Sequence, residues 1–135
     1  MKLDVVTPEG SKIRDLDVRA ITLPGALGEM GILPGHEAMM ASLGIGPMLL
    51  ELPTGAPQTY ALASGFVEVL ADRVRILAEC CERADEIDVE RATAKRAEAE
   101  ARLADVPPIE TEAHNVVAAS LRKAETRIAV AARRG

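Results

Sequence analysis

The chain has 135 residues, enough for one domain or two small ones, and its 48% hydrophobic and 27% charged content is typical of a folded protein. Its formal net charge of −5 and its near absence of aromatic residues argue against a nucleic-acid partner, which needs basic surfaces and stacking platforms. Because no apolar run reaches the roughly 18 residues of a spanning helix, we expect no direct membrane insertion.

Apolar and polar residues alternate in several short segments of the first part of the chain. The segments are 2–5, 12–19, 67–69 and 73–76. A period of two with one polar face is typical of antiparallel strands. Turn-forming residues occur between them, at 8–10, 44–47, 53–55, 64–65 and 71–72. The pattern therefore predicts an antiparallel β-sandwich or flattened barrel over residues 1–84.

The segment 23–36, LPGALGEMGILPGH, holds four glycines and two prolines. It lacks the lysine of a phosphate-binding loop, and no second histidine or carboxylate cluster lies near His36 in the sequence, so we expect neither a phosphate cradle nor a metal site. Glycines at this density suit a backbone that approaches another chain closely. Because Leu27, Met30 and Ile32 would be costly to leave in water, we predict a contact loop.

Two adjacent cysteines, Cys80 and Cys81, occur where the strand-like part ends. Neighbouring cysteines rarely form a disulfide, so we interpret them as reduced, buried or half-buried thiols. Glu79 and Glu82 flank them and could be imagined as part of a catalytic site, but a strand end that enters a linker is the simpler explanation. The sequence shows no nucleophile–base pattern, and we predict no catalytic site of its own.

The period changes near residue 85, where glycine disappears and alanine becomes frequent. Asp88 is a plausible N-cap of a helix that Pro107 and Pro108 would end. Its predicted buried seam consists of Ala94, Ala97, Ala101 and Ala104, and a second helix presents Val117, Leu121, Ala124, Ile128 and Ala131. The pattern predicts an α-helical hairpin over residues 85–135, and hence an α+β chain in two parts. Because small side chains add only about 0.8 kcal/mol each, we expect the hairpin to be weakly held.

The second predicted helix is basic, with Arg122, Lys123 and Arg127 in its middle. These cations could form an ordinary solvated face, or they could meet an acidic partner elsewhere. The residue pattern alone leaves both interpretations open.

Three segments, 23–36, 64–79 and 86–92, resemble the epsilon subunit of the bacterial F-type ATP synthase, and the resemblance extends over nearly the whole chain. It implies a non-catalytic central-stalk (rotor) subunit of a proton-translocating complex, the H⁺-transporting two-sector ATPase. Such a subunit would lie peripherally at the cytoplasmic face of the bacterial plasma membrane.

The resemblance also implies partners for residues 1–84. The family's sandwich binds the gamma subunit and touches the membrane-embedded c-ring. Glu29, Gly31 and Ile32 fall where the family approaches the c-ring, and His36 falls close to the gamma-facing side. For Glu29, a solvated turn carboxylate is the alternative interpretation.

For residues 85–135 the resemblance implies regulation. In the family, the folded hairpin lets the rotor turn, whereas the extended hairpin inserts among the alpha and beta catalytic subunits and blocks ATP hydrolysis. Arg122, Lys123 and Arg127 would then face an acidic loop of the beta subunit.

An alternative function is an ATP-sensing module, because some family members bind ATP on the hairpin through an I/L-D-x-x-R-A motif. Ile87, Asp88, Arg91 and Ala92 match it, although an N-cap followed by a charged partner is also a common helix start. One position where ATP-binding members carry an arginine falls on Glu98. We expect no other cofactor and no metal.

Overall fold

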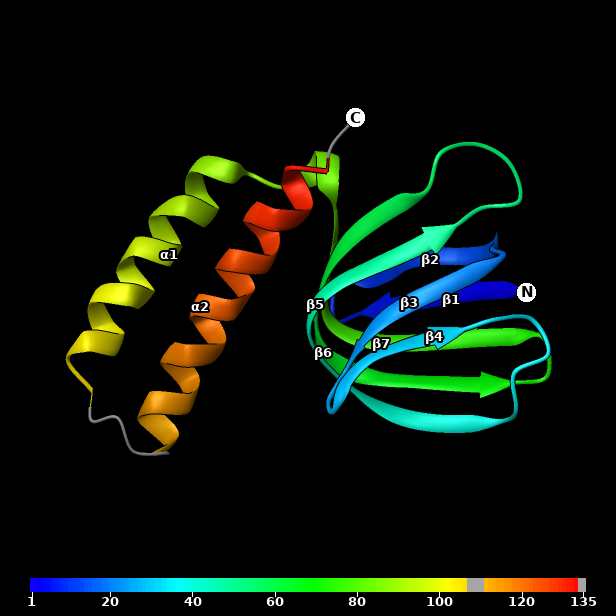
Figure 1. Ribbon diagram of the computed structural model, residues 1–135, viewed down its shortest axis with the longest axis horizontal. Coiled ribbons are helices and arrows are strands. Elements are labelled where there is room, and N and C mark those ends of the chain that lie inside the picture. The colour runs from blue at the N-terminus through cyan, green and yellow to red at the C-terminus, as the bar shows by residue number, and fades with distance from the viewer. Residues whose placement is uncertain (107–110, 134–135) are drawn as a thin grey trace.

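The computed structural model describes residues 1–106 and 111–133 as a seven-stranded sheet followed by two helices (Figure 1). The strands are β1 Lys2–Thr7, β2 Gly10–Asp17, β3 Ala20–Gly25, β4 Gly28–Ile32, β5 Met39–Glu51, β6 Gln58–Leu70 and β7 Arg73–Arg83. A 3₁₀ turn, η1 Ala84–Glu86, then leads to the helices α1 Val89–Ala104 and α2 Glu112–Ala131. The predicted α+β class is confirmed. The predicted break at Pro107 and Pro108 lies outside the described residues.

The strand order is β2-β1-β7-β6-β5-β3-β4, and the sheet curves around a core into a flattened sandwich (Figure 1). Neighbouring strands run antiparallel except β1 and β7, which are parallel. This pair corrects the purely antiparallel prediction. β1 and β7 come from opposite ends of the strand-forming part, so no short turn joins them and imposes an antiparallel direction.

Two predicted turns, 44–47 and 64–65, lie instead inside the long strands β5 and β6. Leu43 pairs with Gly65 and Ile45 with Ala63, so the two segments lie side by side. Figure 1 shows that both strands bend at the end of the sandwich that faces α2. Gly65 has φ of 156°, and a Cβ there would collide with the carbonyl oxygen of Leu77. The glycines therefore allow the sheet to fold over rather than ending the strands.

The core follows the predicted alternation of buried and exposed residues. Fully buried side chains come from both layers of the sandwich and include Leu3, Val5, Ile21, Leu23, Ile32, Met48, Leu50, Leu62, Val67, Val74 and Ile76. The described residues contain no buried charged side chain. The sandwich is thus held mainly by apolar packing.

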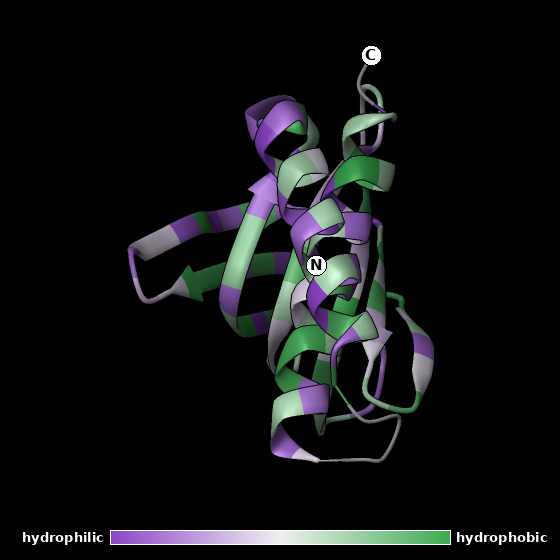
Figure 2. Cartoon of the chain, turned by 90° about the vertical axis from the view of Figure 1, so that its left-hand side faces the viewer, coloured by the Kyte–Doolittle hydropathy of each residue, from purple (hydrophilic) through white to green (hydrophobic). Residues whose placement is uncertain are grey.

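The helices form a hairpin in which α2 lies between α1 and the sandwich (Figure 1). Asp88 caps α1 as predicted, and Thr111 caps α2 by accepting a hydrogen bond from the His114 N–H at 3.1 Å. The predicted face of α2 is confirmed: Val117, Ala124 and Ala131 are buried, and Leu121 and Ile128 are half-buried. Figure 2, viewed onto the hairpin, shows polar and apolar segments alternating along the helices.

The predicted seam of α1 was wrong. All four alanines of that seam, Ala94, Ala97, Ala101 and Ala104, are exposed. The residues turned toward α2 are Ala92 and Ala99, which are buried, together with half-buried Arg96 and Leu103. The helix buries a different set of alanines, so its fully buried side chains are still small.

Candidate functional site

The inner face of α2 carries two cations that pair with carboxylates of the sandwich. Lys123 and Arg127 lie four residues apart and therefore on one side of the helix. The Nε of Arg127 lies 2.6 Å from Oε1 of Glu82, and the Nζ of Lys123 lies 3.8 Å from Oε2 of Glu79. Arg122 is exposed. The structure thus separates the three predicted beta-subunit contacts into two cations held by β7 and one that faces solvent.

A small apolar cluster joins the end of α2 to the sandwich and the linker. It consists of Ala61, Ala84, Ile87, Val130 and Ala131. Val130 is fully buried, and Ile87 is 4% exposed. Three of the five members are alanines, so the apolar contact that holds the hairpin is small.

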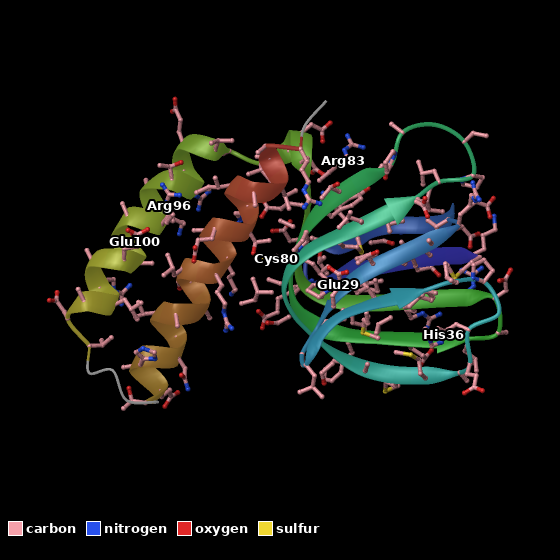
Figure 3. All side chains as sticks on the ribbon, viewed as in Figure 1. Glu29, His36, Cys80, Arg83, Arg96 and Glu100 are labelled. Carbon is pink, nitrogen blue, oxygen red and sulfur yellow. The ribbon has the colours of Figure 1, made fainter. Side chains whose placement is uncertain are left out.

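Cys80 lies where β7 passes α2 (Figure 3). Around it, Lys123 and Arg127 lie with Ala61 and Ala63 of β6 at a small pocket of about 10 Å³. Cys81 points into the core, where burial raises the pKa of its thiol to about 12. Both residues are free cysteines, as predicted.

The segment Ile87–Ala92, which matches the ATP motif, forms the start of α1. Oδ1 of Asp88 accepts a hydrogen bond from the Arg91 N–H at 3.1 Å, while the Arg91 side chain is exposed. Ile87 fills the apolar cluster, and Ala92 is buried against α2. The side chains of Ile87, Asp88 and Ala92 therefore have structural roles at the helix start, and Arg91 contributes its backbone N–H.

A cavity of about 260 Å³ lies between the two helices, away from those four motif residues. Its lining residues are Lys95, Glu98, Ala99, Arg102, Val116, Val117, Ser120, Lys123 and Arg127. Four of them are cations and one is a carboxylate, and Lys123 and Arg127 are the cations already paired with β7. Lys95, which forms no ion pair among the described residues, gives the cavity a cation that can attract an anion. Sequence reasoning missed Lys95 and Arg102. They lie seven residues apart on one helix, which is two turns, and this spacing is the signal that could have indicated them.

The predicted contact loop is in fact the β3–β4 hairpin with the segment that follows it. Leu27 is fully exposed at its turn, and Glu29 and Gly31 are exposed on β4. Ile32 pairs with Ile21 and is completely buried in the core. Its expected contact with the c-ring therefore needs correction, because alternation along β4 turns this side chain inward.

His36 lies beyond the end of β4, at the end of the sandwich away from the hairpin, and it is half-buried (Figure 3). Its Nδ1 lies 2.9 Å from the carbonyl oxygen of Glu37, which accepts the hydrogen bond. The histidine is thus fixed by its own loop, with part of the ring accessible to a partner.

An apolar row on the outer face of the sheet was not anticipated from the sequence. Val6 of β1 pairs with Leu77 of β7, which pairs with Phe66 of β6. These side chains are 36%, 51% and 55% exposed and line a shallow depression of about 600 Å³. Exposed apolar residues in a contiguous row indicate an interaction surface. The register between strands, which the sequence does not give, brings them together.

No group of three or more histidine, cysteine or acidic side chains suitable for a metal ion occurs in residues 1–106 and 111–133. Within the same residues, neither helix is long and apolar enough to cross a membrane.

Comparison with known families identifies the strand-forming part. Residues 1–84 match the family described as the ATP synthase, Delta/Epsilon chain, beta-sandwich domain. This range ends one residue after β7.

Curated relatives extend the similarity to the helices. The "ATP synthase epsilon chain 2" of Syntrophotalea carbinolica is 41% identical and aligns with 100% of this chain and 96% of its own length. The ATP synthase epsilon chain of Geobacter sulfurreducens is 44% identical over 97% of this chain and 93% of the relative. That of Anoxybacillus flavithermus is 45% identical over 76% of this chain and 75% of the relative.

Two solved structures have a similar fold. A chain of the Euglena gracilis mitochondrial ATP synthase, in a structure of OSCP, F1 and c-ring, superposes with a TM-score of 0.81 and 27% identity. The superposition covers 96% of this chain and 79% of that one. A chain from the central stalk and c-ring of the Tetrahymena thermophila enzyme has a TM-score of 0.62 at 16% identity, covering 98% and 94%, which shows the shared fold alone.

Proposed function

The chain belongs to the family of ATP synthase epsilon chains, and from this premise we propose that it is a non-catalytic rotor subunit of a bacterial proton-translocating ATP synthase. The observation that carries the proposal is the similarity to epsilon chains along both the sandwich and the hairpin. In this role the subunit lies peripherally at the cytoplasmic face of the plasma membrane. Its sandwich, residues 1–84, joins the rotor, and its hairpin, residues 85–135, regulates ATP hydrolysis.

The exposed surfaces of the sandwich support contacts with the rotor. We assign the contact with the gamma subunit to the apolar row of Val6, Phe66 and Leu77 together with His36. Burial of this exposed apolar row by a partner would be favourable. We assign the contact with the c-ring to Glu29 and Gly31. All of these residues are at least partly exposed, whereas Ile32 is buried in the core.

The charges on the hairpin support a role in which it restrains the catalytic alpha and beta subunits. When α2 leaves the sandwich, Lys123 and Arg127 lose their carboxylate partners and, with Arg122, form a basic stretch. Such a stretch fits an acidic loop on a beta subunit. The same small-residue seams that dock the helices weakly make this release accessible.

Reversal of these three charges in the assembled ATP synthase tests the hairpin role. The triple variant Arg122→Glu, Lys123→Glu, Arg127→Glu should hydrolyse ATP faster than the wild-type complex, because the acidic loop would repel the helix. Co-purification must first show that the variant still binds gamma and the catalytic subunits. A bound variant with an unchanged ATPase rate would contradict the proposed restraint.

The interhelical cavity favours a second candidate function, ATP sensing. Its cations offer charge-assisted contacts to phosphates. Asp88 and Arg91, which do not line the cavity, offer an alternative site with an acceptor for the adenine amino group and a cation for phosphate. Bound ATP would hold both helices together and favour the folded hairpin.

Calorimetric titration of the isolated chain with ATP and Mg²⁺ tests this second function. Binding that is lost in Arg91→Gln but retained in Arg102→Gln would assign ATP to the motif. The reverse result would assign it to the cavity. An absence of binding at millimolar ATP would exclude a sensing role.

A further inference from the structure

The ion pairs between α2 and β7 differ in how strongly solvent weakens them. The side chains of Arg127 and Glu82 are 26% and 32% exposed, and their atoms approach to 2.6 Å. Lys123 and Glu79 are 34% and 64% exposed, with 3.8 Å between their charged atoms. The first pair is therefore less screened by water and salt and should contribute more to docking.

The sheet beneath these pairs supplies little apolar area. Ile45 of β5 and the core residue Leu62 are the large apolar side chains that line this contact. The other apolar side chains there, Ala61, Ala63 and Cys80, are small. Because the burial of small groups is worth little, the ion pairs account for a substantial share of what holds α2 at this position.

We propose that Glu79 and Glu82, the acidic pair, act as an internal substitute for the acidic surface that α2 meets outside the chain. This inference rests on the proposed function of the hairpin. While α2 is docked, the acidic pair occupies Lys123 and Arg127. An outside acidic surface can therefore use these cations only after it displaces the pair. Arg122, which forms no ion pair among the described residues, remains available for the first contact.

Cys80 provides a natural reporter of this displacement. It lies half-buried beside Lys123 and Arg127 of α2, so a bulky thiol reagent such as DTNB should react with it slowly while the helix is docked. Cys81 stays in the core with a raised pKa and should remain unmodified in the folded chain. The rate of reaction of the isolated full-length chain with DTNB therefore measures the release of α2.

Arg127→Gln is the test variant, and Arg122→Gln is its matched control on the same helix. The proposal requires acceleration of the reaction in Arg127→Gln, by about fivefold for a pair of this exposure, with no change in Arg122→Gln. Equal rates in the two variants would overturn it.

A charge exchange separates the ion pair from other effects of substitution. Arg127→Glu should accelerate the reaction, and adding Glu82→Arg should restore a slow rate. A slower reaction in the double variant than in Arg127→Glu would show that the reversed pair docks the helix again. A double variant as fast as Arg127→Glu would contradict the role of the pair.

The same variants distinguish failure of this inference from failure of the proposed function. Acceleration in the isolated chain without any effect of the triple charge reversal on ATPase activity would support the acidic pair and contradict the hairpin restraint. An effect on ATPase activity without acceleration in the isolated chain would support the restraint and contradict the acidic pair.

Discussion

Lys12 of β2 and Glu86 of η1 form an ion pair at 2.6 Å, although 74 residues separate them in the sequence. Glu86 also accepts a hydrogen bond from the Arg83 N–H at 3.2 Å. The edge strand β2 is thereby tied to the linker, so the first residues of the hairpin start from a fixed point on the sandwich. Motion of the hairpin should therefore begin after η1 rather than within it.

The first prediction concerns the two contacts of Glu86, with Lys12 and with the Arg83 N–H, which together we call the Glu86 brace. Glu86→Gln should accelerate amide exchange in η1 and in the first turn of α1, because both contacts of the carboxylate weaken. Hydrogen-exchange mass spectrometry measures this directly. Glu90→Gln, an exposed carboxylate in the first turn of α1, is the matched control and should leave exchange unchanged.

The brace also predicts a dependence on pH. The hydrogen bond from Lys12 lowers the pKa of Glu86 below its ordinary value of 4.5. A carboxylate with a lowered pKa stabilises the folded state above its unfolded pKa, and this contribution is lost as the pH falls through the folded pKa. The difference in exchange between wild type and Glu86→Gln should therefore be full above about pH 5 and shrink toward pH 3. A difference that grows with acidity would contradict this origin.

The second prediction concerns Val130, which is fully buried at the contact between α2 and the sandwich. Val130→Ala removes two methyl groups and should weaken docking by about 2 kcal/mol. Exchange should rise along α2 while the sandwich keeps its protection. Val116→Ala, at a position that is 59% exposed, provides the control. Equal loss of protection in both parts would show that the hairpin and sandwich unfold as one unit.

The error in the seam of α1 shows how far the sequence can predict such a hairpin. In an alanine-rich helix several faces have alanines at spacings of three and four, so the pattern does not single out one of them. Arg96 takes one of the half-buried positions of α1, with its side chain 43% exposed and its Nε 3.6 Å from Oε1 of the exposed Glu100 (Figure 3). A long side chain can lie along the seam with its charged end in water, and hydropathy alone does not anticipate this. On α2, larger apolar residues fixed the correct face.

The sandwich was predicted better than the candidate surfaces on it. Local alternation identified strands because it depends on neighbouring residues only. The alignment of Phe66 with Leu77 and Val6 depends on the register between three strands. The pairing of Arg127 with Glu82, which lie 45 residues apart in the sequence, depends on how α2 docks on the sandwich. Such long-range relationships leave no periodic signal in one sequence.

The third prediction concerns the fold of the long strands. Gly65→Ala should destabilise the sandwich by about 2 kcal/mol or more, because alanine is strained at φ of 156° and its Cβ would meet Leu77. Gly31→Ala is the matched control, since nothing lies within 4 Å of a Cβ there. Urea unfolding should show a lower midpoint for the first variant alone. Similar midpoints for both would contradict the steric argument.

The last prediction concerns the β3–β4 hairpin in the assembled enzyme. Glu29 is exposed on β4, two residues from the fully exposed Leu27, and its carboxylate is available to basic groups of the c-ring loops. Glu29→Lys would replace this attraction with repulsion, and for exposed charges this corresponds to about fivefold weaker association. ATP-driven proton pumping in reconstituted vesicles should fall relative to the rate of ATP hydrolysis. Glu51→Lys, an exposed carboxylate at the end of β5, makes the same charge change on another strand and should leave that ratio unchanged. Unchanged pumping in Glu29→Lys would mean that this carboxylate is an ordinary solvated group of the turn, and the c-ring contact would then have to be assigned to another surface.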